Sequence, residues 1–390
     1  MPLVISAGSG ALYSALTPLV ALLLLKPADY GLFSIVYLIY AFGISLQYSV
    51  ISEAWARARL VGSRTATWSE YSTSLLGLGF LVGLASLITA LLIPSLLPTS
   101  AFLGAASLLA VYQNGSRYYR VAEETYQRVI ASDLAGLALF AAGFLATSGL
   151  SPLQRVSIAW SMGALAAVVV LGLPYVRRAS GLHLWVRSHR SAIGPLLTDS
   201  LLMDAGAIGT PFLLAGLLGP ARFGVYRAVS NVALPVRLLV EPMRPAIGRS
   251  GRSVLFSAKG LLTVGGAALG MSLAAYFALV WVVPALPFPV GTLAALVPYS
   301  AAAAVFVAGN VLGSVYYILC RTNSTHGQIL TGRFLQTGLV IVFPIVGFLI
   351  QGLAGAIWGF SVSAGISAIA WMVIAFVSRQ RGRGGGEPSG

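Results

Sequence analysis

Long apolar segments recur along the whole chain, separated by short polar corners. Many of them reach roughly the 20 residues that an α-helix needs to cross the hydrocarbon core of a bilayer. Inside lipid, every backbone N–H and C=O group must find a partner within the protein, which a helix provides for itself. This pattern predicts an all-α polytopic membrane protein.

The composition supports this prediction and excludes other classes. Hydrophobic residues make up 57% of the chain and charged residues 9%, with a mean hydropathy of +0.88. The net charge of +14 does not indicate nucleic-acid binding, because the basic residues fall between apolar segments. One cysteine, Cys320, excludes an internal disulfide framework, and the three histidines lack metal-ligand spacing. We expect no metal and no cofactor.

About twelve transmembrane helices are predicted, in two pseudo-symmetric six-helix bundles. Their expected positions are 3–25, 30–52, 71–92, 101–119, 130–147, 156–173, 194–218, 223–242, 255–283, 293–317, 334–350 and 353–377. The predicted domains are an N-terminal lobe (1–173), a cytoplasmic linker (174–193), a C-terminal lobe (194–377) and a disordered, Arg- and Gly-rich tail (378–390).

An internal repeat supports the division into halves. Residues 17–31, TPLVALLLLKPADYG, align without a gap with residues 210–224, TPFLLAGLLGPARFG, and seven of the fifteen positions are identical. In each copy an apolar segment ends in a polar corner, after which Gly and an aromatic residue belong to the next apolar segment. This pattern predicts a helical hairpin at the start of each half.

The basic residues predict the orientation. Of the 24 lysines and arginines, 19 fall on one set of alternate loops or on the tail, which indicates that both termini are cytoplasmic. We expect a multi-pass protein of the bacterial cell membrane. Because six helices per half is an even number, the halves insert in the same orientation, with a pseudo-twofold axis along the membrane normal and a cleft between two lobes.

The repeat also predicts where charge lies within the membrane. Five uncharged positions of the first half (Ser6, Ala11, Ser34, Ile44 and Tyr48) correspond to five charged ones of the second (Asp199, Asp204, Arg227, Arg237 and Glu241). Charge at membrane depth is therefore expected only in the seventh and eighth helices.

Two of these arginines are candidates for binding an anionic substrate. Arg227, with Asn231 one turn away, is interpreted as a cavity-facing anion site, and snorkelling to the outer headgroups is the alternative. Arg237 either contacts substrate or forms a buried ion pair with Asp204, and Glu241 lies four residues further along the same helix.

The acidic residues are candidates for ion coupling. Asp204, near the predicted midplane, is interpreted as a protonation or cation site, or as the partner of Arg237. Asp199 lies nearer the inner face, where a cytoplasmic vestibule would solvate it, and Glu241 completes the acidic set.

Prolines and glycines predict bending and close packing. Pro18 and Pro211 each remove a backbone hydrogen bond from the first helix of a lobe, which permits a hinge, although proline is common in membrane helices. Four GxxxG spacings permit close helix approach, and chance explains some of them in a chain with 44 glycines. They are Gly79/Gly83, Gly266/Gly270, Gly309/Gly313 and Gly355/Gly359.

Arginines of the predicted cytoplasmic loops form a further set. They can gather an anionic headgroup from the inner leaflet, and setting the topology is the alternative explanation. The set comprises Arg117, Arg120, Arg177, Arg178, Arg187 and Arg190.

Three segments carry a family resemblance. LLKPADYGLFSIVYLIYAFGISL, its counterpart GPARFGVYRAVSNVALPVRLL and the loop YRVAEETYQRVIASDL resemble the polysaccharide flippase branch of the multidrug/oligosaccharidyl-lipid/polysaccharide exporter superfamily. The resemblance implies two bundles that alternate access around a central cavity. It also implies transport of a polyprenyl-pyrophosphate-linked oligosaccharide from the inner to the outer leaflet. Glycan polymerase and glycosyltransferases of the same pathway are the partners that it implies, besides membrane lipids.

Two other classes compete with this interpretation. A cation-coupled exporter of small organic, drug-like molecules belongs to the same superfamily and favours an acidic cavity. A membrane-embedded glycan polymerase or glycosyltransferase needs carboxylates or histidines on a sizeable catalytic loop. The predicted outside loops are short, with Asp29 as their one acid, so we expect a transporter and not an enzyme.

Overall fold

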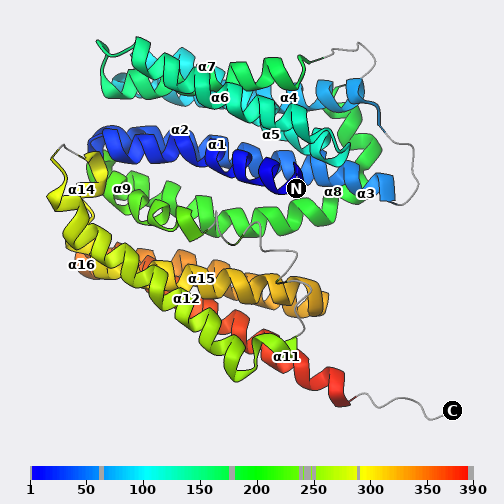
Figure 1. Cartoon of the computed structure of the whole chain (residues 1–390), viewed down its shortest axis with the longest axis vertical. Coiled ribbons are helices and arrows are strands. Elements are labelled where there is room, and N and C mark those ends of the chain that lie inside the picture. Colours follow the sequence, from blue (N-terminus) through cyan, green and yellow to red (C-terminus); the bar gives the residue numbers. More distant parts are fainter. Residues whose placement is uncertain are drawn as a thin grey trace. The chain divides into compact units, whose positions relative to one another are not determined.

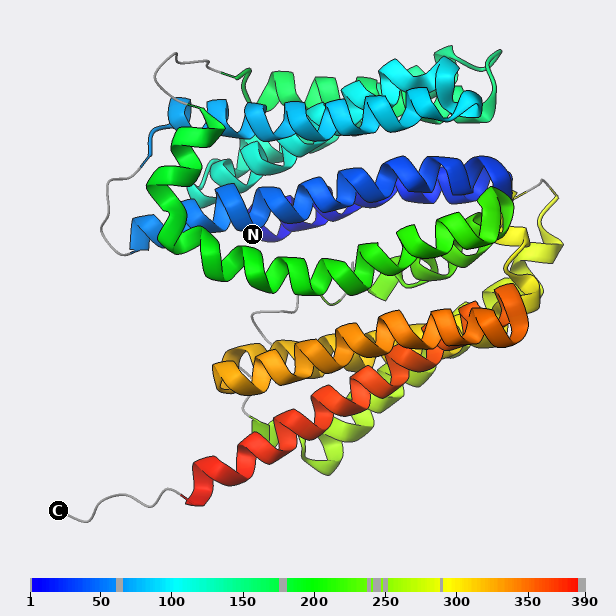
Figure 2. The same cartoon turned by 180° about the vertical axis from the view of Figure 1, so that it is seen from behind.

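The computed structural model describes residues 2–60, 66–174, 181–236, 240, 247, 252–287 and 290–384. Within these ranges the chain forms α-helices with short π and 3-10 segments, and no strand occurs. The all-α prediction is confirmed. The chain divides into two compact units, Met1–Asp204 and Ala205–Gly390, which Figures 1 and 2 show from opposite sides.

Unit 1 is a bundle of long helices. Its elements are α1 (Pro2–Leu24), α2 (Pro27–Leu46), η1 (Gln47–Ser52), α3 (Glu53–Leu60), α4 (Trp68–Leu92), η2 (Pro94–Thr99), α5 (Ser100–Ala122), α6 (Tyr126–Ala146), α7 (Pro152–Leu171) and α8 (Leu182–Asp204). In Figure 1, α4 to α7 lie together, with α1 and α2 beside them, and α1 contacts α6 while α2 contacts α4.

Unit 2 contains the remaining elements. They are η3 (Ala205–Gly209), α9 (Thr210–Val232), α11 (Arg252–Leu255), α12 (Ala258–Phe277), η4 (Ala278–Val282), α13 (Val283–Ala285), α14 (Gly291–Ala294), η5 (Val297–Tyr299), α15 (Ser300–Asn323) and α16 (His326–Gly384). The helix α15 packs on α12 and on α16, and in Figure 2 these three helices are coloured from yellow-green through orange to red.

The polar corners fall where the sequence predicts them. Lys26 is extended between α1 and α2, with φ −64° and ψ 157°. Gly219 breaks α9 with φ 70° and ψ 162°, a conformation that favours glycine. Gln351 (φ −134°, ψ 21°) and Gly352 (φ 58°, ψ −134°) break α16, and the positive φ again falls on glycine.

Ten helical stretches are long and apolar enough to cross a membrane, among the described residues. Two of them, Leu182–Val236 and Gly327–Val377, each contain one of the breaks just described. Dividing both stretches there is consistent with the predicted twelve helices, and a multi-pass membrane protein is thus supported.

Some helix ends differ from the prediction. The helix α8 begins at Leu182, inside the span predicted as a linker, and α16 continues to Gly384, past the predicted start of the tail at 378. Residues 385–390 lie outside the described part. The lobe boundaries at 173 and 194 remain a prediction.

A tertiary contact explains the early start of α8. The segment η1 is a π-helix, whose altered hydrogen-bond pattern disturbs the regular α-helical ladder of carbonyls. The indole Nε1 of Trp185 donates to the Val50 carbonyl oxygen in η1 at 2.8 Å, and Trp185 is buried. The first turn of α8 is therefore held against the second membrane span by a side chain of the predicted linker.

The four GxxxG spacings differ in what they contact. A Cβ at Gly83 would lie 2.9 Å from the Gly104 carbonyl oxygen, and one at Gly355 would overlap the Gly347 carbonyl oxygen. Around Gly266 and Gly270, in contrast, nothing lies within 4 Å. The first two glycines permit helices to pack backbone against backbone, whereas the pair on α12 faces open space.

We expect Gly355→Ala to lower the thermal stability of the purified protein. The added methyl group meets backbone that cannot rotate away, and such overpacking costs about 1–3 kcal/mol. Gly266→Ala is the matched control, since it adds the same group on a membrane helix with no neighbour. Equal melting temperatures for the two variants in detergent would contradict the close approach at Gly355.

Candidate functional site

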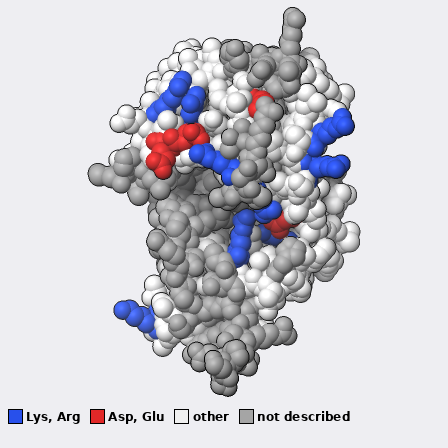
Figure 3. All heavy atoms as spheres, turned by 90° about the vertical axis from the view of Figure 1, so that its right-hand side faces the viewer, with Lys and Arg blue, Asp and Glu red and all other residues white. Residues whose placement is uncertain are grey.

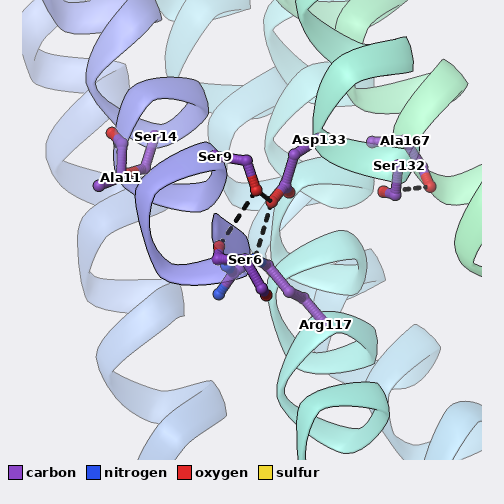
Figure 4. A network of polar contacts seen from close by, with 8 residues as sticks. All are labelled: Ser6, Ser9, Ala11, Ser14, Arg117, Ser132, Asp133 and Ala167. Atoms are coloured by element: carbon purple, nitrogen blue, oxygen red, sulfur yellow. Dashed lines mark hydrogen bonds and ion pairs between the residues drawn. The ribbon is translucent and has the colours of Figure 1, made fainter. Parts of the chain in front are cut away.

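A buried charged pair joins three helices of unit 1. Asp133 of α6 is fully buried, and its Oδ2 accepts hydrogen bonds from the Ser9 hydroxyl at 2.7 Å and from Arg117 Nε at 3.4 Å. Arg117, on α5, also donates through Nη2 to the backbone carbonyl of Ser6. Figure 4 shows Asp133 and Arg117 converging on the first turns of α1.

Small residues of α1 and α6 make this approach possible. Ser6, Ser9 and Gly10 lie on one face of α1, because residues three and four apart share a face of a helix. A Cβ at Gly10 would overlap the Arg117 guanidinium. On α6, a Cβ at Gly136 would meet the ring of Tyr13, so both helices present glycine at the contact.

The two charges of the pair differ in exposure. The Asp133 side chain has 0% exposure and that of Arg117 has 24%, and the second carboxylate oxygen, Oδ1, has no hydrogen-bond partner among the described residues. Asp133 is the eighth residue of α6, about 10 Å along the helix from its first residue. A carboxylate at that depth is costly unless a cation or a proton compensates it.

This arrangement has two chemically reasonable states. In the state described here, Arg117 compensates the carboxylate. If Asp133 takes up a proton, or a small cation at Oδ1, the guanidinium is no longer required and can move to the solvent that it already reaches. Asp133 is therefore a buried carboxylate whose charge either Arg117 or a bound proton or cation can compensate.

The predicted location of charge at membrane depth was wrong for these two residues. Arg117 is expected on a cytoplasmic loop, yet it lies inside α5, and Asp133, which the internal repeat does not single out, lies inside α6. Charge within a membrane-spanning helix is thus present in the first half as well. The signal that identifies Asp133 is its position as the single acid of a long and largely apolar helix.

The predicted ion-coupling residues are described in part. Asp204 is buried at the end of α8, and Asp199 is half-buried one turn earlier. Arg237 and Glu241 lie outside the described residues, so the expected pairing of Arg237 with Asp204 or Glu241 remains a prediction.

Arg227 lies half-buried on α9 and binds its own helix. Its Nη1 donates to the Ser230 hydroxyl at 2.8 Å, and that hydroxyl donates to the Arg227 carbonyl at 2.7 Å. Within the described part of the chain, Arg227 forms no ion pair with an acidic side chain. Asn231 follows on the same face at i+4. The anion-binding role of both residues remains a prediction.

The two repeated prolines have different surroundings. Pro18 lies inside the uninterrupted helix α1, whereas Pro211 is the second residue of α9 and follows the π-segment η3. A π-segment next to a proline provides an alternative hydrogen-bond pattern where the regular one is broken. The hinge role of both prolines remains a prediction.

Unit 2 contains an apolar hollow of about 370 Å³. It is lined by the two parts of α16 that precede and follow the break at Gln351 and Gly352. Val342, Phe343, Val346, Gly347, Ile350, Gln351, Gly355, Trp358, Gly359 and Val362 line it. Its lining carries no charged side chain, and Gln351 and Trp358 are the two lining residues with a polar side-chain atom.

Basic side chains are prominent on the surface at the right-hand side of Figure 1. Figure 3 looks onto that surface and shows the lysines and arginines in blue among smaller groups of acids in red. Arg59 and Glu123, whose side chains are both exposed, form an ion pair.

Comparisons with known proteins identify the fold. No protein-family model matches the chain, and no curated protein matches it. Among solved structures, the inward-facing conformation of a multidrug resistance MATE family transporter of the MOP superfamily is similar, with a TM-score of 0.64 and 16% identity over 98% of this chain and 94% of that one. An outward-facing conformation of such a transporter has a TM-score of 0.57 and 16% identity, over 97% and 93% of the two chains.

A third similar structure is a mutant of VcmN, a MATE transporter of Vibrio cholerae. It has a TM-score of 0.56 and 15% identity, and the match covers 97% of this chain and 95% of that one. At these identities the likeness establishes the fold, which is that of MATE transporters and extends over nearly the whole chain.

Proposed function

We propose that this chain exports small organic molecules across the membrane by alternating access, and that it couples export to a proton or sodium ion taken up at Asp133. Support for transport comes from the fold, since the similar structures cover both halves of the chain and include inward- and outward-facing conformations. The multidrug transporters among them favour an organic solute over a lipid-linked glycan.

The proposed coupling of export to ion uptake is based on the buried carboxylate of Asp133. It is fully buried beside a single guanidinium group, and its second oxygen, Oδ1, has no hydrogen-bond partner among the described residues. Exchange of Arg117 for a proton or cation converts ion binding into rearrangement at α1, which gives a physical link between an ion gradient and a conformational change.

Cells that overproduce the protein test the substrate class. Efflux of fluorescent lipophilic organic cations should rise above that of cells carrying an empty vector. Unchanged efflux, together with lipid-linked oligosaccharide accumulating on the inner leaflet of cells that lack the protein, would contradict the exporter and favour the flippase.

A second candidate function is flipping of a polyprenyl-pyrophosphate-linked oligosaccharide, and Arg227 favours it. This guanidinium has no acidic partner among the described residues, and its planar fork suits two phosphate oxygens. The corresponding residue of the first half, Ser34, shows that the repeated helix does not require a cation at this position.

Arg227 separates the two functions. If the substrate is a pyrophosphate carrier, Arg227→Ala should reduce flipping about tenfold, the effect of about 1.4 kcal/mol of lost binding. Arg227→Lys should recover only part of it, and both proteins should be as abundant as wild type, because among the described residues the side chain binds its own helix. Abundance and transport are measured together; an abundant, fully active Arg227→Ala protein would show that this side chain takes no part.

A further inference from the structure

Two arginines of unit 1, Arg120 and Arg128, converge on the end of α7, and no acidic atom of the described residues lies with them within 4 Å of the Gly172 Cβ position. Nη2 of Arg120, in the last turn of α5, and Nη2 of Arg128, in the first turns of α6, each lie 3.4 Å from the point where Gly172 would carry a Cβ. The residue has φ +124° and no side chain. Gly172 thus leaves an open space between two guanidinium groups that any other residue would fill.

The remaining contacts fix both arginines but leave donors unused. Arg128 Nε donates to the Val170 carbonyl at 2.8 Å, and the Arg120 guanidinium lies 4.6 Å from the ring centre of Trp68. The Gly172 carbonyl accepts a bond from the Tyr112 hydroxyl at 3.3 Å. Arg120 Nε has no partner among the described residues, and neither Nη2 atom donates to a described protein atom.

The local charge is strongly positive. Glu123 interacts electrostatically with Arg120 but also forms an ion pair with Arg59, so its single charge is shared between two arginines, and Glu124 is exposed. The C-terminus of α7 contributes only about half of a negative charge, which does not neutralise two guanidinium groups. Two like charges held this close are stabilised when an anion lies between them, and Arg is the side chain best suited to bind phosphate oxygens from two directions.

We propose that Arg120 and Arg128, above Gly172, bind the phosphate of an anionic phospholipid at the membrane surface. The position favours a lipid over a free phosphate, because α5, α6 and α7 all have an end there and Trp68, at the start of α4, supplies the aromatic ring typical of a membrane–water interface. This site lies outside the Asp133 pair and does not rest on the proposed transport activity.

Lipid binding by purified protein tests this site. Native mass spectrometry and thermal unfolding are measured with added phosphatidylglycerol, phosphatidylcholine or inorganic phosphate. Wild type should bind phosphatidylglycerol in preference to phosphatidylcholine, whose ammonium group is repelled by the arginines. The double variant R120Q/R128Q should bind phosphatidylglycerol about tenfold or more weakly, as expected for the loss of charge-assisted hydrogen bonds.

The matched control is R57Q/R321Q, which removes two exposed charges outside the headgroup-gathering set, one from α3 and one from the last turn of α15. It should stay within about twofold of wild type, because a general surface charge adds little. The variant R120K/R128K keeps the charge and should bind at an intermediate level, which distinguishes lost binding from misfolding.

Two results would overturn this assignment. Equal losses of lipid in R120Q/R128Q and R57Q/R321Q would show that only the overall charge attracts the lipid. Stabilisation by inorganic phosphate as strong as that by phosphatidylglycerol at the same concentration would show that the site does not select a lipid.

Discussion

Arg117→Ala is expected to accumulate poorly in the membrane and to unfold at a markedly lower temperature than wild type. The substitution leaves the fully buried Asp133 carboxylate without its cation, and breaking a buried ion pair from one side costs about 3–5 kcal/mol. Asp133→Ala should cost less, because the stranded Arg117 side chain is already 24% exposed and can turn to solvent. Abundance and melting temperature in detergent measure both effects.

The double variant R117A/D133A provides the critical comparison. It leaves neither charge buried without its partner, so it should recover part of the stability lost in Arg117→Ala. The interaction energy between Arg117 and Asp133 from this double-mutant cycle should therefore be favourable. Arg59→Ala and Glu123→Ala serve as controls, because this ion pair has exposures of 47% and 37% and exposed pairs contribute about 0–1 kcal/mol. Strictly additive losses at Arg117 and Asp133 would contradict the coupling of the two side chains.

Asp133→Asn is expected to remove ion-driven transport while leaving more folded protein than Arg117→Ala. An amide has nearly the size of the carboxyl group and can still accept the bond from the Ser9 hydroxyl, but it neither takes up a proton nor binds a cation strongly. Ser9→Ala, which removes one hydrogen bond and no charge, should reduce transport far less. Transport per molecule of folded protein is the quantity to compare.

An Asp133→Asn protein that transports at the wild-type rate under an imposed gradient would show that the carboxylate is structural. In that case Asp199 and Asp204 of α8 are the next acids to replace, since the sequence already selects them for ion coupling.

Local sequence was sufficient to predict the corners of the fold. The breaks at Gly219 and at Gln351–Gly352, and the extended Lys26 before Pro27, follow from residues that favour positive φ or begin a helix. The start of α8 could not be predicted in this way, because it depends on Trp185 binding a carbonyl in a π-segment that is distant in sequence.

The candidate site depends on contacts that no local pattern contains. Asp133 meets Ser9 across 124 positions of sequence and Arg117 across 16. The internal repeat directed attention to charged residues that replace neutral ones, and it had no means of identifying a charge in the first half whose partner lies on a different helix. The convergence of Arg120 and Arg128 over Gly172 likewise appears only when α5, α6 and α7 are placed together.

The two candidate substrates, a lipid-linked oligosaccharide and a small organic molecule, are favoured by different observations. Sequence resemblance favours a polysaccharide flippase, whereas the structural likeness is to multidrug transporters at 16% identity. Arg227 supports an anionic carrier and Asp133 supports cation coupling, and each prediction concerns a different unit of the chain.

Transport by purified protein in liposomes tests the central claim most directly. A proton or sodium gradient is imposed, and uptake of a fluorescent lipophilic organic cation is recorded for wild type and Asp133→Asn. We expect one of the two gradients to drive uptake in wild type and to have no effect in Asp133→Asn. No uptake under either gradient by folded wild-type protein, or equal uptake by the two proteins, would contradict ion-coupled export through Asp133.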